Sequence, residues 1–269
     1  MRRISPTIGQ VRTARPWLSP RGINVGWSRE KCRSPRLVVP WRSDVLRREL
    51  ARPSWLGEQV ALGTITDCYQ PAEGRFRVTR GVLEALLERR NPISMVTKST
   101  MVLRDLDLLA ELARVRVYFT VTTMDPALWR AVEPGTPPPW KRLHVMRLLL
   151  QAGVPAGVLM APILPGLTDS VAAIEAVMAA AAEHGAAFFG ATALRLAPHV
   201  KEHYLDVVGA AFPDLLPRYQ RAYPAVNAPR DYQTALQTRV ERIKARLASG
   251  GSAPNVPWLR NSGTTPVIS

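Results

Sequence analysis

The chain has 269 residues, of which 46% are hydrophobic, enough to bury a sizeable core as one large α/β domain or two small ones. The sequence has no run of about 18 apolar residues, and no apolar segment follows the initial Met-Arg-Arg, so we expect neither a membrane span nor a secretory signal. Two cysteines at unrelated positions do not make a disulfide framework, and a reducing cytoplasm is the expected location.

The net charge of +15 is distributed unevenly along the chain. Residues 1–55 contain 13 basic and 3 acidic residues, a balance of +10, whereas the remaining residues contribute only +5. Residues 1–43 also scatter prolines and tryptophans among arginines with no apolar period of 2 or 3.6. We expect a disordered basic leader, or a misread one, since a shifted reading frame would produce such a sequence. A basic arm that binds nucleic acid is the alternative.

Helical patterns and short apolar runs alternate through residues 44–200. In chain order, the first half predicts a helix from Asp44 that ends at Pro53, a strand over Val60–Thr64, a helix over Thr79–Arg90, a strand over Ile93–Lys98, a helix over Thr100–Ala113 and a strand over Val115–Val121. Thr79 is available as N-cap of its helix, and Ser99 or Thr100 caps the next one.

The second half continues the alternation. It predicts a short helix over Pro126–Val132, a turn-rich loop over Pro134–Pro139, a helix over Trp140–Ala152, a strand over Ala156–Ile163, a helix over Asp169–His184 and a strand over Ala187–Leu194. Residues 201–248 predict a helical C-terminal extension, and residues 249–269, rich in Gly, Ser and Pro, a flexible tail. Continuous apolar strands separated by helices predict an α/β fold, a partial (β/α) barrel with parallel strands over residues 44–200.

In such barrels the chemistry lies at the carboxyl ends of the strands, where polar residues converge on one rim. The first three predicted strands end in polar residues: Thr64, Thr66, Asp67, Thr97, Lys98, Thr120 and Thr122. Lys98 could pair with a ligand carboxylate or phosphate, act as a Schiff-base nucleophile, or extend to solvent. Asp67 could support a neighbouring ligand-binding residue or cap the following turn.

Several segments, in this order, resemble one known family. They are TITDCYQPAEGRFRVTRG from residue 64, RNPISMVTKS from residue 90, LRDLDLLAELA, RVYFTVTTMDPALWRAVEPGTPPPWKRL and LMAPILPGLTD. Together they are similar to radical S-adenosylmethionine (radical SAM) proteins of the spore photoproduct lyase-like kind. The resemblance implies a [4Fe-4S] cluster that binds S-adenosylmethionine, a 5′-deoxyadenosyl radical, and a reductant such as flavodoxin or ferredoxin.

The resemblance also implies cofactor-binding roles for three residues. Thr66 is expected at the methionine moiety, Lys98 at its carboxylate and Thr120 at a nearby polar contact. Thr64 falls where spore photoproduct lyases place a hydrogen-donating cysteine, so repair of thymine dimers is not implied. Ile65 departs from the usual asparagine and Cys68 from the usual proline, and Cys68 is either a reactive thiol or a chance substitution.

The gravest departure concerns the cluster. The family's CxxxCxxC motif is absent, and Cys32 and Cys68 cannot supply the three thiolates required. His199 and His203, spaced i, i+4, could share a metal, but no carboxylate motif accompanies them, so no metal site is predicted. We therefore expect a truncated or impaired radical SAM protein whose enzymatic activity is uncertain. The alternatives are a barrel lyase or aldolase that uses Lys98 and a non-catalytic basic nucleic-acid-binding protein.

Overall fold

The computed structural model describes residues 43–64, 66–249 and 256–260. Five strands form one sheet in the order of the chain: β1 (Val60–Leu62), β2 (Ile93–Thr97), β3 (Val115–Thr120), β4 (Ala156–Ile163) and β5 (Phe189–Ala193). Every neighbouring pair is parallel. Sequential parallel strands require a crossover after each strand. The predicted α/β partial barrel is confirmed.

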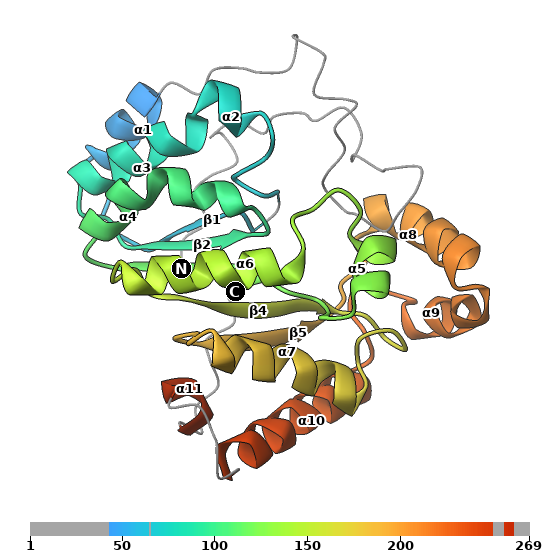
Figure 1. The fold of residues 1–269 in the computed structure, drawn as a ribbon. Coiled ribbons are helices and arrows are strands. Elements are labelled where there is room, and N and C mark those ends of the chain that lie inside the picture. The colour runs from blue at the N-terminus through green and yellow to red at the C-terminus, as the bar shows by residue number, and fades with distance from the viewer. Residues whose placement is uncertain (1–42, 65, 250–255, 261–269) are drawn as a thin grey trace.

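Helices make these crossovers (Figure 1). They are α3 (Val78–Glu88) before β2, η2 (Thr100–Asp105) with α4 (Leu106–Glu111) before β3, α5 (Pro126–Val132) and α6 (Pro139–Gln151) before β4, and α7 (Val171–Glu183) before β5. Two further helices, α1 (Ser43–Leu50) and α2 (Glu73–Phe76), flank β1 in the sequence. The loops that follow the strands all lie at one rim of the sheet, which positions the site.

Local capping chemistry sets where several helices begin. Ser99, one of the two expected caps, accepts a hydrogen bond from the N–H of Met101 at the start of η2. The expected cap of α3 is wrong, because the helix begins at Val78 with Arg77 as its N-cap. Thr79 instead lies inside the first turn, where its hydroxyl donates to the carbonyl of Cys68 at 2.5 Å. That threonine fastens the loop after β1 to α3.

The core lies between the sheet and the crossover helices. Val117, Phe119, Val158 and Met160, on the central strand β3 and its neighbour β4, are fully buried. Gly157 on β4 permits a close approach, because a Cβ at this position would lie 2.3 Å from the carbonyl oxygen of Phe188. The continuous apolar strands therefore reflect burial on both faces of the sheet.

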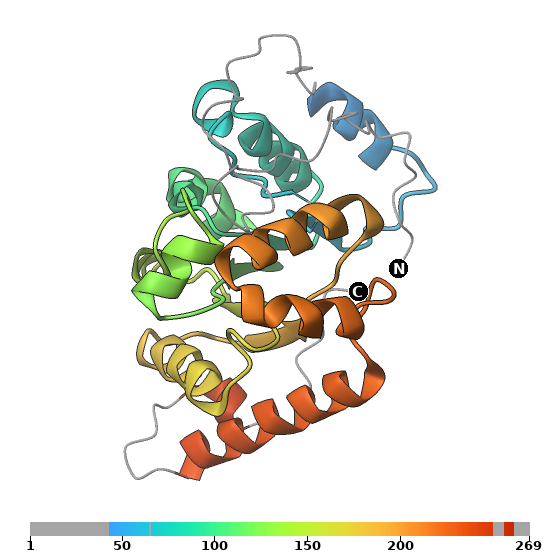
Figure 2. The same cartoon turned by 90° about the vertical axis from the view of Figure 1, so that its right-hand side faces the viewer.

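The C-terminal region is helical, as expected from the sequence: α8 (Pro198–Ala211), η3 (Pro213–Leu215), α9 (Leu216–Ala222) and α10 (Arg230–Ser249). Buried side chains of α8 and α9, among them Tyr204 and Tyr219, form a second hydrophobic cluster with Leu194 and Leu196 from the end of β5. α10 packs beside α7 and buries Leu236 and Val240 in the main core (Figure 2). Thus α10 packs against the edge strand β5, whereas α8 and α9 pack against the residues that follow β5.

The predicted leader, residues 1–43, lies outside the described residues apart from Ser43, which begins α1. Residues 249–269 were expected to form a flexible tail, but one described segment within them is a short helix, α11 (Pro257–Arg260). Trp258 is buried there, stacks on Phe189 at 5.1 Å between ring centroids, and donates its indole N–H to the carbonyl of Ala186. A buried aromatic ring outweighs the turn-forming composition around it. Among the described helices, none is both long and apolar enough to cross a membrane.

Candidate ligand-binding site

A cavity of about 430 Å³ opens at the carboxyl ends of the strands. Its polar wall comes from the ends of β1, β2 and β3 and the loops that follow them: Thr64, Thr66, Asp67, Lys98, Thr120 and Thr122. Its apolar wall comes from the ends of β4 and β5 and from α8: Leu159, Leu164, Leu194, Leu196, Val200 and Tyr204. The volume falls within the range of about 300–1,000 Å³ that is usual for small-molecule sites.

The structure brings together the three residues predicted to bind a cofactor. Thr66, Lys98 and Thr120 follow or end three different strands, and all three line this cavity. The parallel pairing of the strands explains the convergence, because the carboxyl ends of parallel neighbours meet at the same edge. The geometry is compatible with a shared ligand, although the roles assigned to these residues stay predictions.

Asp67 joins the loop that follows β1 to the end of β2. Its Oδ1 accepts hydrogen bonds from the hydroxyl of Thr97 at 2.8 Å and from the N–H of Tyr69 at 2.9 Å. Its Oδ2 accepts from the N–H of Lys98 at 2.7 Å. Asp67 therefore caps its own turn, one of the two roles considered from the sequence, and also holds the backbone of Lys98, whose role in ligand binding stays a prediction.

Lys98 points into the cavity beside a carboxylate that the sequence reasoning did not identify. Its Nζ lies 3.9 Å from Oε1 of Glu133, and the Lys98 side chain is 25% exposed whereas that of Glu133 is 7% exposed. The hydroxyl of Thr122 donates to the same Oε1 at 3.0 Å. Burial raises the pKa of Glu133, but the charges of Arg142 and Lys98 and the hydrogen bonds outweigh burial, so the pKa lies below its ordinary value.

Arg142 supports Glu133 from behind. Its side chain is fully buried, and Nη2 donates to Oε2 of Glu133 at 2.6 Å and to the hydroxyl of Thr136 at 2.6 Å. Its Nη1 donates to the carbonyl of Thr120 and its Nε to the carbonyl of Pro137, both at 2.7 Å. One guanidinium thus joins the end of β3 to the loop that carries Glu133.

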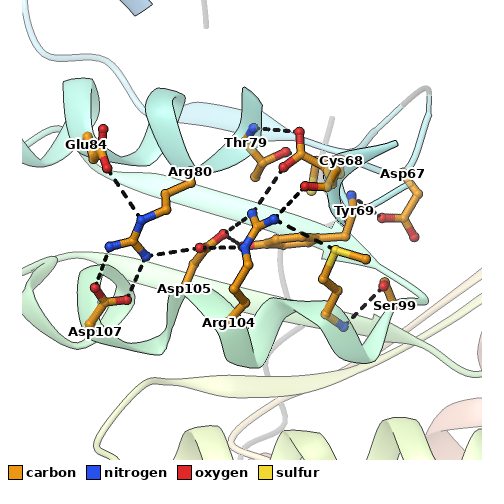
Figure 3. A network of polar contacts seen from close by, with 12 residues as sticks. Asp67, Cys68, Tyr69, Thr79, Arg80, Glu84, Ser99, Arg104, Asp105 and Asp107 are labelled. Atoms are coloured by element: carbon orange, nitrogen blue, oxygen red, sulfur yellow. Dashed lines mark hydrogen bonds and ion pairs between the residues drawn. The ribbon is translucent and has the colours of Figure 1, made fainter. Parts of the chain in front are cut away.

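A second network holds the segment after β1 (Figure 3). Asp105 at the end of η2 is fully buried, and its carboxylate accepts from the hydroxyl of Tyr69 at 3.1 Å, from Arg104 at 2.7 Å and from Arg80 at 3.2 Å. Arg104 also reaches Glu73 at 3.1 Å. Because Tyr69 and Glu73 belong to the segment between β1 and α3, this network fixes the backbone that follows Thr66 and Asp67 in the cavity wall.

The cysteines do not fit a [4Fe-4S] cluster. Such a cluster needs three thiolates, and the whole sequence has two cysteines. Cys32 lies outside the described residues, and Cys68 is not part of the cavity lining. Burial raises the pKa of the Cys68 thiol, with Asp67 adding to the shift, which disfavours a reactive thiolate. Within the described ranges, no group of three or more His, Cys, Asp or Glu side chains is arranged to hold a metal ion.

Glu133 could have been found in the sequence by one rule, whereas Arg142 could not. Functional groups in barrels occur on the loops that follow strands as well as at the strand ends themselves. Glu133 belongs to the connection after β3, directly after α5, and precedes the proline-rich turn read only as a loop. Arg142 gave no such signal, because an arginine on a helix is most often exposed.

Fold and site together define a parallel-stranded partial barrel with a ligand cavity at its carboxyl rim. The family model of the radical SAM superfamily matches residues 49–177. An uncharacterized protein of Mycobacterium tuberculosis is 37% identical over 227 residues, which are 83% of this chain and 67% of that protein. An uncharacterized protein of Methanocaldococcus jannaschii is 29% identical over 133 residues, 48% of this chain and 51% of that protein. The chain belongs to the radical SAM superfamily.

Solved structures agree at the level of the fold. A spore photoproduct lyase mutant superposes with a TM-score of 0.55 at 16% identity, covering 76% of this chain and 64% of that chain. A lyase mutant with bound AdoMet and dinucleoside spore photoproduct also gives a TM-score of 0.55 at 16% identity, with 76% and 62% covered. The chain therefore spans slightly less than two thirds of the length of these lyase chains.

Proposed function

We propose that this chain binds S-adenosylmethionine in the cavity at the strand ends. The observation that carries the proposal is the convergence of Thr66, Lys98 and Thr120 on one cavity in a chain of the radical SAM superfamily. The Lys98 ammonium is the natural partner for the carboxylate of the methionine moiety. The hydroxyls of Thr66 and Thr120 supply hydrogen bonds along the same wall.

The contact between Lys98 and Glu133 favours ligand pairing over Schiff-base chemistry. A Schiff-base lysine must lose its proton to attack a carbonyl, whereas a carboxylate 3.9 Å away favours the charged ammonium. The lyase or aldolase alternative therefore receives less support from this geometry than binding of a carboxylate-bearing ligand.

We also propose that this chain does not cleave S-adenosylmethionine reductively, or does so only weakly. When bound, the cluster of this superfamily supplies the electron for that cleavage. Two cysteines, of which Cys68 is not part of the cavity lining, cannot provide three thiolate ligands. A flavodoxin-like or ferredoxin-like reductant would then have no acceptor in this chain.

Two measurements on the full chain test the proposal. Calorimetric titration with S-adenosylmethionine is expected to show saturable binding that Lys98→Ala weakens at least tenfold, whereas Lys141→Ala, at an exposed lysine on α6, leaves binding unchanged. Equal affinities for the two variants would contradict the assigned site. After anaerobic reconstitution with iron and sulfide, we expect no stoichiometric four-iron absorption and no 5′-deoxyadenosine under a strong reductant. Formation of both would contradict the second part.

A further inference from the structure

Four charged side chains line the cavity within the described residues: Asp67, Lys98, Glu133 and Arg195. The two positive and two negative charges balance. Asp67 is already committed to hydrogen bonds with the chain itself. Arg195 is exposed, so solvent screens its charge. The electrostatic character of the site therefore depends mainly on Lys98 and the buried carboxylate beside it.

Glu133 cannot turn away from Lys98. Its Oε2 is held by Arg142 at 2.6 Å and its Oε1 by Thr122 at 3.0 Å, so both oxygens are fixed from opposite sides. Oε1 is the atom that faces the Lys98 ammonium. Arg142 lies behind this carboxylate and does not line the cavity. A ligand at Lys98 therefore meets an ammonium with a fixed negative charge next to it.

We propose that Glu133 is a specificity-determining residue that favours S-adenosylmethionine over adenine nucleotides. This inference rests on the proposed function. S-adenosylmethionine combines one carboxylate with an ammonium and a sulfonium, so its net charge is positive. Adenosine monophosphate has the same adenosine group but ends in a phosphate with nearly two negative charges. Lys98 attracts either anion, whereas the adjacent Glu133 repels the phosphate more strongly and attracts the cationic groups.

The substitution Glu133→Gln removes this charge and keeps the shape. The amide oxygen can still accept from Arg142, and the amide nitrogen can donate to the Thr122 hydroxyl. Lys98 then has no opposing charge within the cavity at this position. We expect the affinity for adenosine monophosphate to rise at least tenfold and the affinity for S-adenosylmethionine to fall. The matched control is Glu111→Gln, at an exposed glutamate on α4 outside the cavity lining, which changes the net charge equally and should leave both affinities as in the wild type.

Equilibrium dialysis of both ligands on the intact chain provides the test. If Glu133 had a merely structural role, its substitution would lower the affinity for both ligands together. An unchanged preference between the two ligands therefore overturns the inference. If the wild type does not bind S-adenosylmethionine, the proposed function fails, while the gain in adenosine monophosphate binding still tests Glu133 by itself. No gain overturns the inference.

If thermal melting shows that Glu133→Gln is unfolded, Lys98→Met tests the same idea in the opposite direction. The loss of the ammonium leaves Glu133 as the dominant charge, so the preference for S-adenosylmethionine over adenosine monophosphate must increase. A preference that stays constant or decreases in Lys98→Met overturns the inference equally.

Discussion

Replacement of Arg142 by methionine should strongly destabilise the fold. The guanidinium is fully buried and donates hydrogen bonds to four groups: the carbonyls of Thr120 and Pro137, the hydroxyl of Thr136 and the carboxylate of Glu133. Breaking a buried ion pair from one side costs about 3–5 kcal/mol, because the partner charge is left without compensation. We expect the free energy of unfolding to fall by about 4 kcal/mol in Arg142→Met. Denaturation in urea, followed by circular dichroism, measures this loss.

The stability difference between wild type and Arg142→Met should depend on pH, in a direction that follows from the pKa of Glu133. In the wild type the pKa of Glu133 lies below its ordinary value of 4.5, so its contribution is present above that pH and is lost on acidification through the folded-state pKa. Without Arg142, burial is no longer outweighed to the same extent and the pKa of Glu133 should rise. Protonation of Glu133 then removes the unpaired buried charge in the variant. The difference in stability between wild type and Arg142→Met should therefore narrow as the pH falls.

Two further variants complete this test. Arg147→Met, at an exposed arginine on the same helix that donates to the carbonyl of Glu183, should stay within about 0.5 kcal/mol of the wild type. The double variant Glu133→Gln with Arg142→Met should lose less than the sum of the two single variants, because no unpaired charge remains. A loss below about 1 kcal/mol in Arg142→Met, or a difference that widens on acidification, would refute the reasoning.

Three other predictions concern the scaffold, each measured as a change in the urea midpoint. Asp105→Asn should destabilise the fold by about 2–3 kcal/mol because it weakens four hydrogen bonds that three side chains donate to a buried carboxylate. Asp107→Asn, at the exposed end of that network, should cost under about 1 kcal/mol, and equal losses in the two variants would argue against the network. Gly63→Ala should lower the urea midpoint far more than Gly153→Ala. Both glycines have φ near +80°, but only a Cβ on Gly63 would clash, at 2.1 Å from a carbonyl oxygen of β2. Similar midpoints for the two variants would exclude that clash. Trp258→Ala should cost about 3–5 kcal/mol, and no change would mean that α11 does not contribute to the core.

The strands and most helices could be predicted because burial imposes their pattern on the sequence. A parallel sheet covered by helices needs continuous apolar runs, and Ala156–Ile163 was predicted with the bounds that the structure shows. Pro126–Val132 was also predicted with its observed bounds. Pro126 at the first helical position and Asp125 before it, which accepts from the N–H groups of Ala127 and Leu128, explain that agreement.

Tertiary contacts decided the features that the sequence did not predict. Thr79 has the chemistry of a cap, but a carbonyl from the loop after β1 competes for its hydroxyl. Trp258 lies in a segment of turn-forming composition, and contacts with the distant Phe189 and Ala186 make it a core residue. Glu133 and Arg142 pair because β3, α6 and the loop after α5 meet in space, and no local sequence signal predicts that contact.

At the end of β2, the sequence predicted one residue of the site, Lys98, but not the carboxylate beside it. The rule that chemistry lies at strand ends selected Lys98, and the structure places its ammonium in the cavity. The same rule could not show that a buried carboxylate stands 3.9 Å from this ammonium. The proposed ligand preference of the site depends on that pairing.

A crystal structure of the chain soaked with S-adenosylmethionine tests the central claim most directly. The account predicts the ligand in the cavity, with its carboxylate within hydrogen-bonding distance of the Lys98 ammonium and its remaining groups along the wall formed by Thr66 and Thr120. A ligand bound on another face of the protein, or in the cavity with its carboxylate away from Lys98, would contradict it.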